Sequence, residues 1–300
     1  MTDVKGGTEA VVLSTEAKFA ADGVDAGHPH TGMLVLRDDD LLLFAEAEDE
    51  PLFRLPLQDL TDLSTGYVPR AYEERFEDAI ALSWAGDGDG GVVLLAPQGV
   101  SDRRFLVALL SQVVDGVRAV VVHPTRRGEQ ETDEEPAVER LYAHPYELEF
   151  GGSDERGTGT VIRFSSIIHV EEERIVYDNS RVPGLAIRYL RTIGPNLTTQ
   201  LRPIDSDRYA LLQRVVTWEY NRRVREVKQL TLTPEEKEVL RALYDASSGR
   251  DRALTATLDR SSQELTALLG RLKRKELIRQ DTNRATLSRT GHMLFTLEKV

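Results

Sequence analysis

The sequence predicts an α+β protein in which helices follow small antiparallel sheets instead of alternating with parallel strands. Three observations lead to this prediction. Short apolar runs bounded by Gly, Pro or Asp fill most of the first 200 residues, which is typical of antiparallel strands. Two amphipathic helices, expected at residues 102–116 and 206–228, follow these runs. The last seventy residues then change to a helical periodicity.

The first module is expected over residues 1–122. Ser101 or Asp102 is a good N-cap for its helix, whose apolar residues recur three and four positions apart. These apolar residues are Phe105, Leu106, Leu109, Leu110, Val113 and Val117. The strands before the helix are expected at residues 32–37, 41–47, 52–57, 79–84 and 92–96.

A second module, over residues 138–229, repeats this order of strands and helix. The segment Leu95–Arg104 before the first helix resembles Leu201–Tyr209 before the second, which indicates an internal duplication. The alternative, two unrelated modules with similar turns, stays open. The expected strands lie at residues 148–150, 160–164, 167–170, 174–177, 185–190 and 197–201. We expect both modules to be pleckstrin-homology-like (PH-like), with residues 123–137 between them as an acidic linker or exposed loop.

Residues 230–300 are predicted to form a winged helix-turn-helix. Thr233 caps a first helix, with Pro234 at its first position and Glu236 three residues after the cap. A short second helix is expected at residues 253–258 and a third after Ser261. Residues 277–280 and 284–288 then form a two-stranded wing, and a turn at residues 290–291 leads into a closing segment at 293–297.

Composition indicates a cytoplasmic protein, with 50 acidic and 38 basic residues and a net charge of −12. The basic residues are mostly Arg, as expected for a salt-rich cytoplasm, where added ions screen repulsion between surface carboxylates. No long apolar segment or signal peptide is evident. The absence of cysteine excludes disulfides, thiolate metal sites and cysteine nucleophiles.

The charge is unevenly distributed along the chain. Residues 230–300 hold thirteen Lys/Arg and ten Asp/Glu, a net charge of +3, whereas residues 1–229 carry −15. Anionic membrane lipids and nucleic-acid backbones both need cationic surface, so they are poor partners for the first 229 residues.

No motif in the sequence recommends an enzyme, and we expect no catalytic, cofactor-binding or metal-binding residues. The glycine-rich segment 86–91 joins two expected strands, which indicates a hairpin loop instead of a phosphate site. Residues 38–40, three aspartates, are expected to be a solvated turn. His28 and His30 lack a third metal ligand nearby in the sequence.

A winged helix also allows a second interpretation, a DNA-binding transcription regulator with a sensory N-terminal half. The N-terminal part of the third helix, which would meet the bases, carries Gln263, Glu264 and Ala267, and a carboxylate there usually repels phosphates. The basic residues that would support DNA binding lie elsewhere: Arg271, Lys273, Arg274 and Lys275 towards the end of this helix, with Arg279, Arg284 and Arg289 on the wing.

The whole pattern resembles the archaeal taxis adaptor family CheF. The resemblance rests on the segments Gly32–Arg37, Arg163–Ile167, Tyr220–Arg225 and Leu232–Leu240, and it covers essentially the full chain. It implies a non-enzymatic adaptor that links the response regulator CheY, preferentially in its phosphorylated form, to the archaellum motor and controls rotational switching. CheC, CheD and cytoplasmic archaellum components are the other implied partners, and the archaellum base is the implied location.

The expected partner-binding residues are the basic side chains at the end of the long helix and on the winged helix, with two apolar anchors. Charge reversal at Arg222 and Arg223 is expected to weaken binding of CheY without lowering the melting temperature. A homodimer, the division of partners among modules and residual DNA affinity remain open. The full set is Arg222, Arg223, Arg225, Arg271, Lys273, Arg274, Lys275, Leu277 and Phe295.

Overall fold

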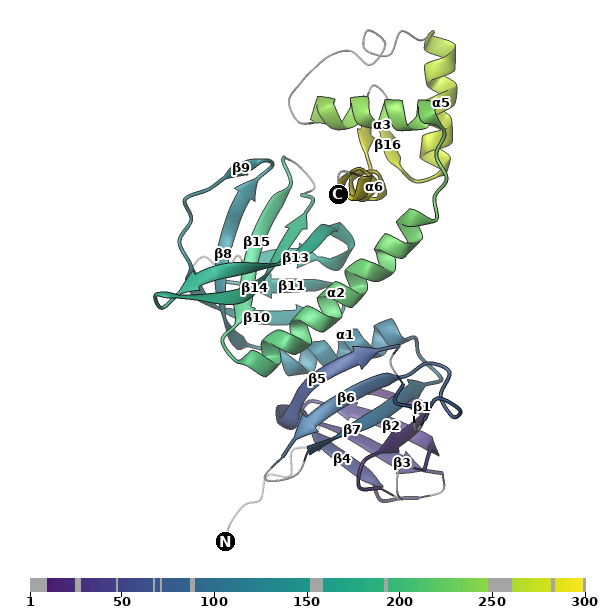
Figure 1. Cartoon of the computed structure of the whole chain (residues 1–300), viewed down its shortest axis with the longest axis vertical. Helices are drawn as coiled ribbons and strands as arrows, with labels where there is room; N and C mark the ends of the chain where they lie inside the picture. Colours follow the sequence, from purple (N-terminus) through teal and green to yellow (C-terminus); the bar gives the residue numbers. More distant parts are fainter. Residues whose placement is uncertain are drawn as a thin grey trace. The chain divides into compact units, whose positions relative to one another are not determined.

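The structure, a computed structural model, describes residues 10–24, 28–46, 48–66, 68–70, 72–86, 90–151, 159–191, 194–247, 261–281 and 284–298. In these residues the first sheet has seven strands in the order β4-β3-β2-β1-β7-β6-β5 (Figure 1). The pairs for which a register is defined are antiparallel, as predicted. The strands are β1 (Val11–Ala21), β2 (His30–Arg37), β3 (Asp40–Ala45), β4 (Phe53–Pro56), β5 (Leu60–Thr65), β6 (Ile80–Ala85) and β7 (Gly90–Pro97).

Helix α1 (Asp102–Val113) follows this sheet and buries its apolar stripe. Ser101 is the N-cap, since its side chain accepts a hydrogen bond from the backbone N–H of Arg104. Phe105 and Leu106 have no exposed surface, and Leu109 keeps only 1%. The helix ends before Gly116, whose φ of +64° lies in the left-handed region that favours glycine. Val117 therefore belongs to the next strand and not to the helical stripe.

The second sheet has the same strand order as the first. Its order is β12-β11-β10-β8-β15-β14-β13, with the short β9 (Gln130–Glu131) paired to β8. If β9 is set aside and the strands are counted from β8, both orders read fourth, third, second, first, seventh, sixth, fifth. The strands are β8 (Val117–Arg127), β10 (Ala137–His144), β11 (Glu147–Phe150), β12 (Thr160–Arg163), β13 (Ile167–Tyr177), β14 (Ser180–Tyr189) and β15 (Leu197–Pro203).

The two sheets also share a 3-10 turn at the same place. Turn η2 (Leu57–Asp59) separates β4 from β5, and turn η3 (Phe164–Ser166) separates β12 from β13. The residues before the turns, Pro56 and Arg163, have φ/ψ of −61°/129° and −70°/129°. The two sheets therefore agree both in strand order and in the backbone geometry before this turn.

The expected linker at residues 123–137 is largely strand. It contains the last residues of β8, the whole of β9 and the first residue of β10. The sequence did not predict these strands, because residues 124–136 contain no apolar run. Hydrogen bonds of backbone and polar side-chain groups hold the strands together instead. The Thr125 hydroxyl donates to the Thr198 carbonyl at 3.2 Å, and the backbone N–H of Thr132 donates to the Thr125 carbonyl at 2.9 Å.

The separate strands expected at 167–170 and 174–177 are one strand, β13, in a long hairpin with β14. Asp178 and Asn179 form its tip with φ of 49° and 56°. Positive φ at two successive tip residues is the geometry of a tight two-residue hairpin turn.

Helix α2 (Ser206–Lys228) follows the second sheet. Its N-cap is Asp205, whose carboxylate accepts from the backbone N–H groups of Asp207 and Arg208 at 2.9 Å each. The buried stripe of α2 includes Leu212, Val216, Tyr220, Val224 and Val227.

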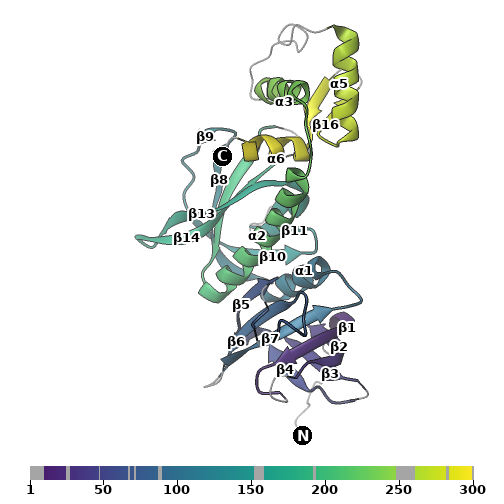
Figure 2. The ribbon, with the colours of Figure 1, turned by 45° about the vertical axis from the view of Figure 1, so that its right-hand side comes forward.

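The C-terminal region contains three described helices and one ribbon, whereas the short helix expected at 253–258 lies outside the described residues. The helices are α3 (Pro234–Ser247), α5 (Ser262–Arg274) and α6 (Arg289–Glu298). Strands β16 (Ile278–Asp281) and β17 (Arg284–Leu287) pair antiparallel, as expected for the wing. Helix α6 lies against β13 (Figure 2).

The expected turn at residues 290–291 is instead the first turn of α6. The helix approaches the start of the ribbon closely at Gly291, where a Cβ would stand 2.3 Å from the Leu277 carbonyl oxygen. The glycine therefore serves close packing here and not chain reversal.

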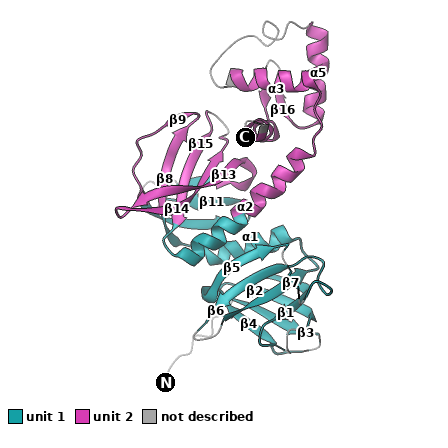
Figure 3. Ribbon diagram, in the orientation of Figure 1, with its two compact units in different colours: residues 1–119, 138–161, 203–215 teal, residues 120–137, 162–202, 216–300 magenta. Residues whose placement is uncertain are grey.

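By compactness the chain divides into two units (Figure 3). The first comprises residues 1–119, 138–161 and 203–215, and the second comprises residues 120–137, 162–202 and 216–300. The first half of α2 belongs to the first unit, and its second half belongs to the second unit with the C-terminal region.

A buried carboxylate joins α3 to the end of α5. Glu236 is 1% exposed and completes the expected capping box, since it accepts from the Thr233 N–H at 3.0 Å. It also accepts from Lys275 Nζ at 2.7 Å, and Arg271 Nε lies 3.5 Å away. Burial alone would raise the pKa of Glu236, but the hydrogen bonds from Lys275 and Thr233 and the nearby charges of Lys275 and Arg271 lower it.

Replacing Lys275 with Met should lower the free energy of unfolding by about 1–3 kcal/mol, because it removes a hydrogen-bonded cation from a buried carboxylate. Urea denaturation measures this loss, and K273M is the control because Lys273 is exposed on the same helix. A group with a lowered pKa stabilises the fold above its ordinary value of 4.5. The difference between wild type and K275M should therefore shrink as the pH falls below 4.5. An equal loss in K273M would contradict this account.

Candidate functional site

The basic residues expected to bind a partner form two groups on the C-terminal half of the chain. The α2-end group is Arg222, Arg223 and Arg225, and the α5-end group is Arg271, Lys273, Arg274 and Lys275. The structure assigns different roles to the members of each group, because some pair with buried carboxylates and others are exposed.

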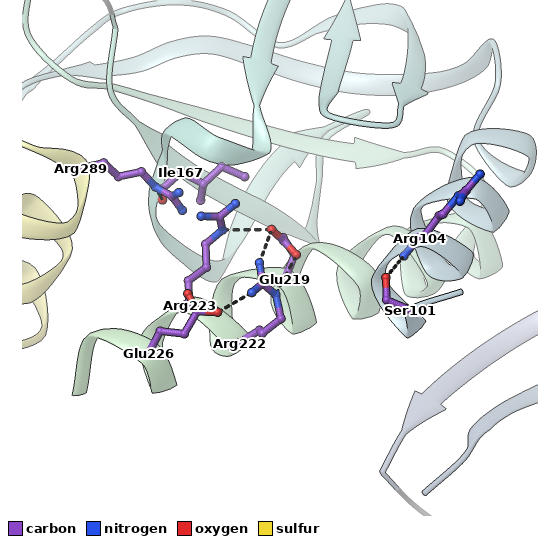
Figure 4. Close-up of polar contacts among 8 residues, drawn as sticks. All are labelled: Ser101, Arg104, Ile167, Glu219, Arg222, Arg223, Glu226 and Arg289. Carbon is purple, nitrogen blue, oxygen red and sulfur yellow. Dashed lines mark hydrogen bonds and ion pairs between the residues drawn. The ribbon is translucent and has the colours of Figure 1, made fainter. Parts of the chain in front are cut away.

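In the α2-end group, Arg222 and Arg223 surround the buried side chain of Glu219 (Figure 4). Arg222 contacts Glu219 through Nη2 at 3.2 Å, and Arg223 contacts it through Nε at 3.0 Å. Arg222 also pairs with Glu226 at 2.5 Å, one helical turn further on. Only Arg225 of this group is exposed.

These pairs change the expected effect of the Arg222 and Arg223 variants. Burial by itself would lower the pKa of Arg222, but the hydrogen bond and charge of Glu219, with the charge of Glu226, raise it. Both arginines therefore stabilise a carboxylate that is 2% exposed. The geometry instead predicts that charge reversal lowers the melting temperature, because reversal would place acidic groups around a buried acid.

Arg289, the first residue of α6, lies beside this group (Figure 4). Its Nε donates to the carbonyl of Ile167 at the start of β13, at 3.0 Å. Burial lowers the pKa of Arg289 to about 10, and the positive charge of Arg223 acts in the same direction. Arg289 remains protonated at neutral pH. It is attached to the second sheet and is therefore not a wing residue directed towards a nucleic-acid phosphate.

In the α5-end group, Lys275 and Arg271 are turned towards Glu236, as described above. Lys273 and Arg274 are exposed on the last turn of α5, where cations also complement the helix dipole. The exposed cations of the two expected groups are thus Arg225, Arg271, Lys273 and Arg274, and of these Arg271 also pairs with Glu236.

The two apolar anchors differ from expectation. Leu277 has no exposed surface and belongs to the core of the C-terminal region, so it does not offer contact area to a partner in this conformation. Phe295 is partly buried, and its ring stacks on that of Tyr244 with centroids 3.8 Å apart. Apolar periodicity marks both as inward-facing and cannot separate an anchor from a core residue.

His28, His30 and Asp40 contact other side chains of the protein. No group of three or more potential metal ligands was found in the described residues. The ring of His30 stacks on that of Phe19 at 5.6 Å, and His28 lies 3.5 Å from Arg75. Asp40 is not solvated as expected but 1% exposed, because it pairs with Arg54 at 2.7 Å.

At the glycine-rich segment 86–91, Ala85 pairs with Gly90 and Trp84 pairs with Gly91, as expected for a hairpin. Its residues 87–89 lie outside the described part of the chain. A loop between antiparallel strands lacks the helix N-terminus that a glycine-rich phosphate loop uses.

Sequence reasoning missed Glu219, around which the α2-end group is organised. A signal was present, because Glu219 lies three residues after Val216 and seven after Leu212, on the apolar stripe of α2. A carboxylate at such a position is buried on one face of the helix and requires a partner. Arg222 and Arg223, three and four residues further on, are the nearest cations on that face.

Comparison with known proteins shows the family. Residues 11–222, more than two thirds of the 300, match the family described as archaeal chemotaxis signal transduction system protein F, or CheF. The chain belongs to this family. The taxis protein CheF2 of Halobacterium salinarum is 28% identical over 281 residues, which is 94% of each chain.

The family match ends at Arg222 and so includes both sheets and most of α2. The similarity to CheF2 is longer and must include part of the C-terminal region. The chain is thus a member of an archaeal chemotaxis signalling family, with an α+β fold of antiparallel sheets and helices at the C-terminal end. Among the described helices, none combines the length and apolarity needed to cross a membrane.

Changing both Arg222 and Arg223 to Met should lower the free energy of unfolding by about 1–3 kcal/mol, because two cations that pair with buried Glu219 are lost. Urea or thermal denaturation of the full chain measures this. The control R225M should stay within about 0.5 kcal/mol of the wild type, as surface substitutions usually do. Adding E219Q to the double variant should recover part of the loss. A double variant as stable as R225M would show that the Glu219 pairs contribute little.

Proposed function

We propose that this CheF protein is a non-enzymatic adaptor that binds the response regulator CheY, preferentially when phosphorylated, and couples it to the archaellum motor to control rotational switching. Membership of a chemotaxis signalling family and similarity to a taxis protein along most of the chain support the assignment to taxis. CheC, CheD and cytoplasmic archaellum components are the further proposed partners.

The proposed architecture is two PH-like modules followed by a winged helix. Two sheets of identical strand order, each followed by a helix, support the first part. The helices α3 and α5 and the β16–β17 ribbon support the second. We place the modules at residues 1–122 and 138–229 and the winged helix at 230–300. The strand content of residues 117–137 supports moving the start of the second module to Val117.

The observation that supports CheY binding is the exposure of Lys273 and Arg274 at the end of α5, together with Arg225 on α2. Lys273 and Arg274 are exposed in a chain of net charge −12. A cationic patch on an acidic protein orients an acidic partner, and complementary potentials mainly raise the association rate and the specificity. Because salt screens exposed charges, this steering weakens at high ionic strength.

Reversing the charge of Lys273 and Arg274 together should weaken binding of CheY activated with beryllofluoride by about tenfold, or roughly 1.4 kcal/mol. Isothermal titration calorimetry at fixed salt measures the dissociation constant. The melting temperature should not fall, because neither side chain pairs with a buried carboxylate in the structure. R174E is the matched control, since Arg174 is exposed on the β13–β14 hairpin.

Two results would contradict the proposal. Unchanged affinity in the Lys273/Arg274 variant would move the interface away from the end of α5. Equal affinity of the wild type for active and inactive CheY would remove the switching role. The DNA-binding alternative has less support, because Glu264 and Gln263 occupy the exposed N-terminal turn of α5.

A further inference from the structure

The arginine cluster between α2, β13 and α6 has more cations than carboxylates among its described members. Arg222, Arg223 and Arg289 carry three positive charges, and Glu219 and Glu226 carry two negative ones. Glu219 contacts Arg222 and Arg223, whereas Glu226 contacts Arg222. In the described ion pairs, Arg289 is therefore the arginine of the cluster that contacts no carboxylate.

Arg289 also has an incomplete set of hydrogen bonds. Its Nε donates to the Ile167 carbonyl, but its Nη2 is buried and has no hydrogen-bond partner among the described residues. The positive charge of Arg223, which is drawn with Arg289 in Figure 4, acts on this guanidinium. A buried donor without an acceptor costs free energy, and a neighbouring like charge adds to that cost.

The backbone of α6 acts in the same sense. Arg289 is the first residue of this ten-residue helix, so its backbone lies at the N-terminal end of α6, which carries a partial positive charge. The Ser288 hydroxyl already accepts from the backbone N–H of Gly291 at 3.2 Å and caps that end. The guanidinium groups are therefore the ligand-binding groups, and the helix end adds only to the local potential.

We infer that Arg289, Arg223 and Arg222 form a binding site for one oxyanion, a carboxylate or phosphoryl group that a protein partner presents. The planar guanidinium group of an arginine can bind two oxygens of such a group at once, which the ammonium group of a lysine cannot do. The anion would balance the excess charge and give Arg289 Nη2 an acceptor after a small shift of the side chain. This inference deepens the proposed function, on which the identity of the partner rests.

The site also has a regulatory consequence. Arg222 and Arg223 lie on α2, whereas Arg289 lies on α6 and reaches the others only while α6 is attached to β13. An anion that contacts both helices therefore binds the attached arrangement more tightly and increases its population. Partner binding and attachment of the C-terminal region are thus linked, each favouring the other.

Sulfate is the probe for the site itself, tested on the full-length protein. At an ionic strength matched with sodium chloride, sulfate at ten times its dissociation constant should raise the melting temperature of the wild type by about 2–4 °C. The rise should disappear in R289M and in R223M, whereas R225M should keep it. Slower hydrogen exchange in residues 167–172 with sulfate should accompany the rise.

The second arm tests whether the partner uses the site. Sulfate should weaken binding of activated CheY to the wild type more than sodium chloride of equal ionic strength does, and R289M should lack this difference. R289K, which keeps the charge but not the planar guanidinium group, should restore only part of it.

The outcomes separate this inference from the proposed function. A sulfate effect equal in R289M, R223M and R225M is a general salt effect and overturns the site. A sulfate effect specific to Arg289 without competition against CheY overturns the role of the partner. Absence of CheY binding to the wild type overturns the proposed function, and the thermal measurement still decides whether the anion site exists.

Discussion

The last strand at one edge of each sheet follows a 3-10 turn, and at each of these junctions an arginine from a later helix donates to a backbone carbonyl group. In the first unit, Arg208 Nη1 on α2 donates to the Leu57 carbonyl at 2.9 Å. In the second unit, Arg289 Nε on α6 donates to the Ile167 carbonyl at 3.0 Å. Leu57 lies in the turn before β5, Ile167 is the first residue of β13, and both strands end their sheets in the described part of the chain. These two hydrogen bonds tie α2 and α6 to the sheet edges of their own units.

The two attachments differ in their electrostatics. Near the first, Arg214 on α2 pairs with Asp62 on β5 through two contacts of 3.2 and 3.4 Å, so opposite charges meet. Near the second, burial and the charge of Arg223 lower the pKa of Arg289, and the nearby carboxylates offset only part of this decrease. A desolvated cation beside a like charge weakens its own attachment. An added anion therefore strengthens the contact between α6 and β13 more than the contact between α2 and β5. Helix α6 belongs to residues 230–300, whose net charge is +3.

Much of the fold could be predicted from the sequence. Apolar runs indicated most strands, and capping residues with helical periodicity indicated α1, α2, α3 and α5. Strand β1 was missed because its buried positions include Thr15 and Ala17, which give a weak apolar alternation. Strand β8 was missed because it follows α1 directly, and Val117 also fitted the helical stripe. The three glutamates at 171–173 divided β13 in the prediction, although an exposed hairpin tolerates them.

The site was predictable only in part, because sequence shows where charges lie but not which are paired. Arg222, Arg223, Arg271 and Lys275 look like solvated helix ends in sequence, yet they pair with Glu219 and Glu236, which are buried. Leu277 looks like an anchor and is core. Arg289 was grouped with the wing because its contact, Ile167, is 122 residues away. Such long-range partners set burial and pairing, and local periodicity carries no information about them.

The central claim is that the end of α2 and the end of α5 form the surface that recognises activated CheY. Hydrogen exchange measured by mass spectrometry on the full chain, with and without beryllofluoride-activated CheY, tests it most directly. The account predicts slower exchange in peptides covering residues 219–228 and 271–275, and little change with inactive CheY. Protection confined to residues 11–113, or equal protection by both forms of CheY, would contradict it.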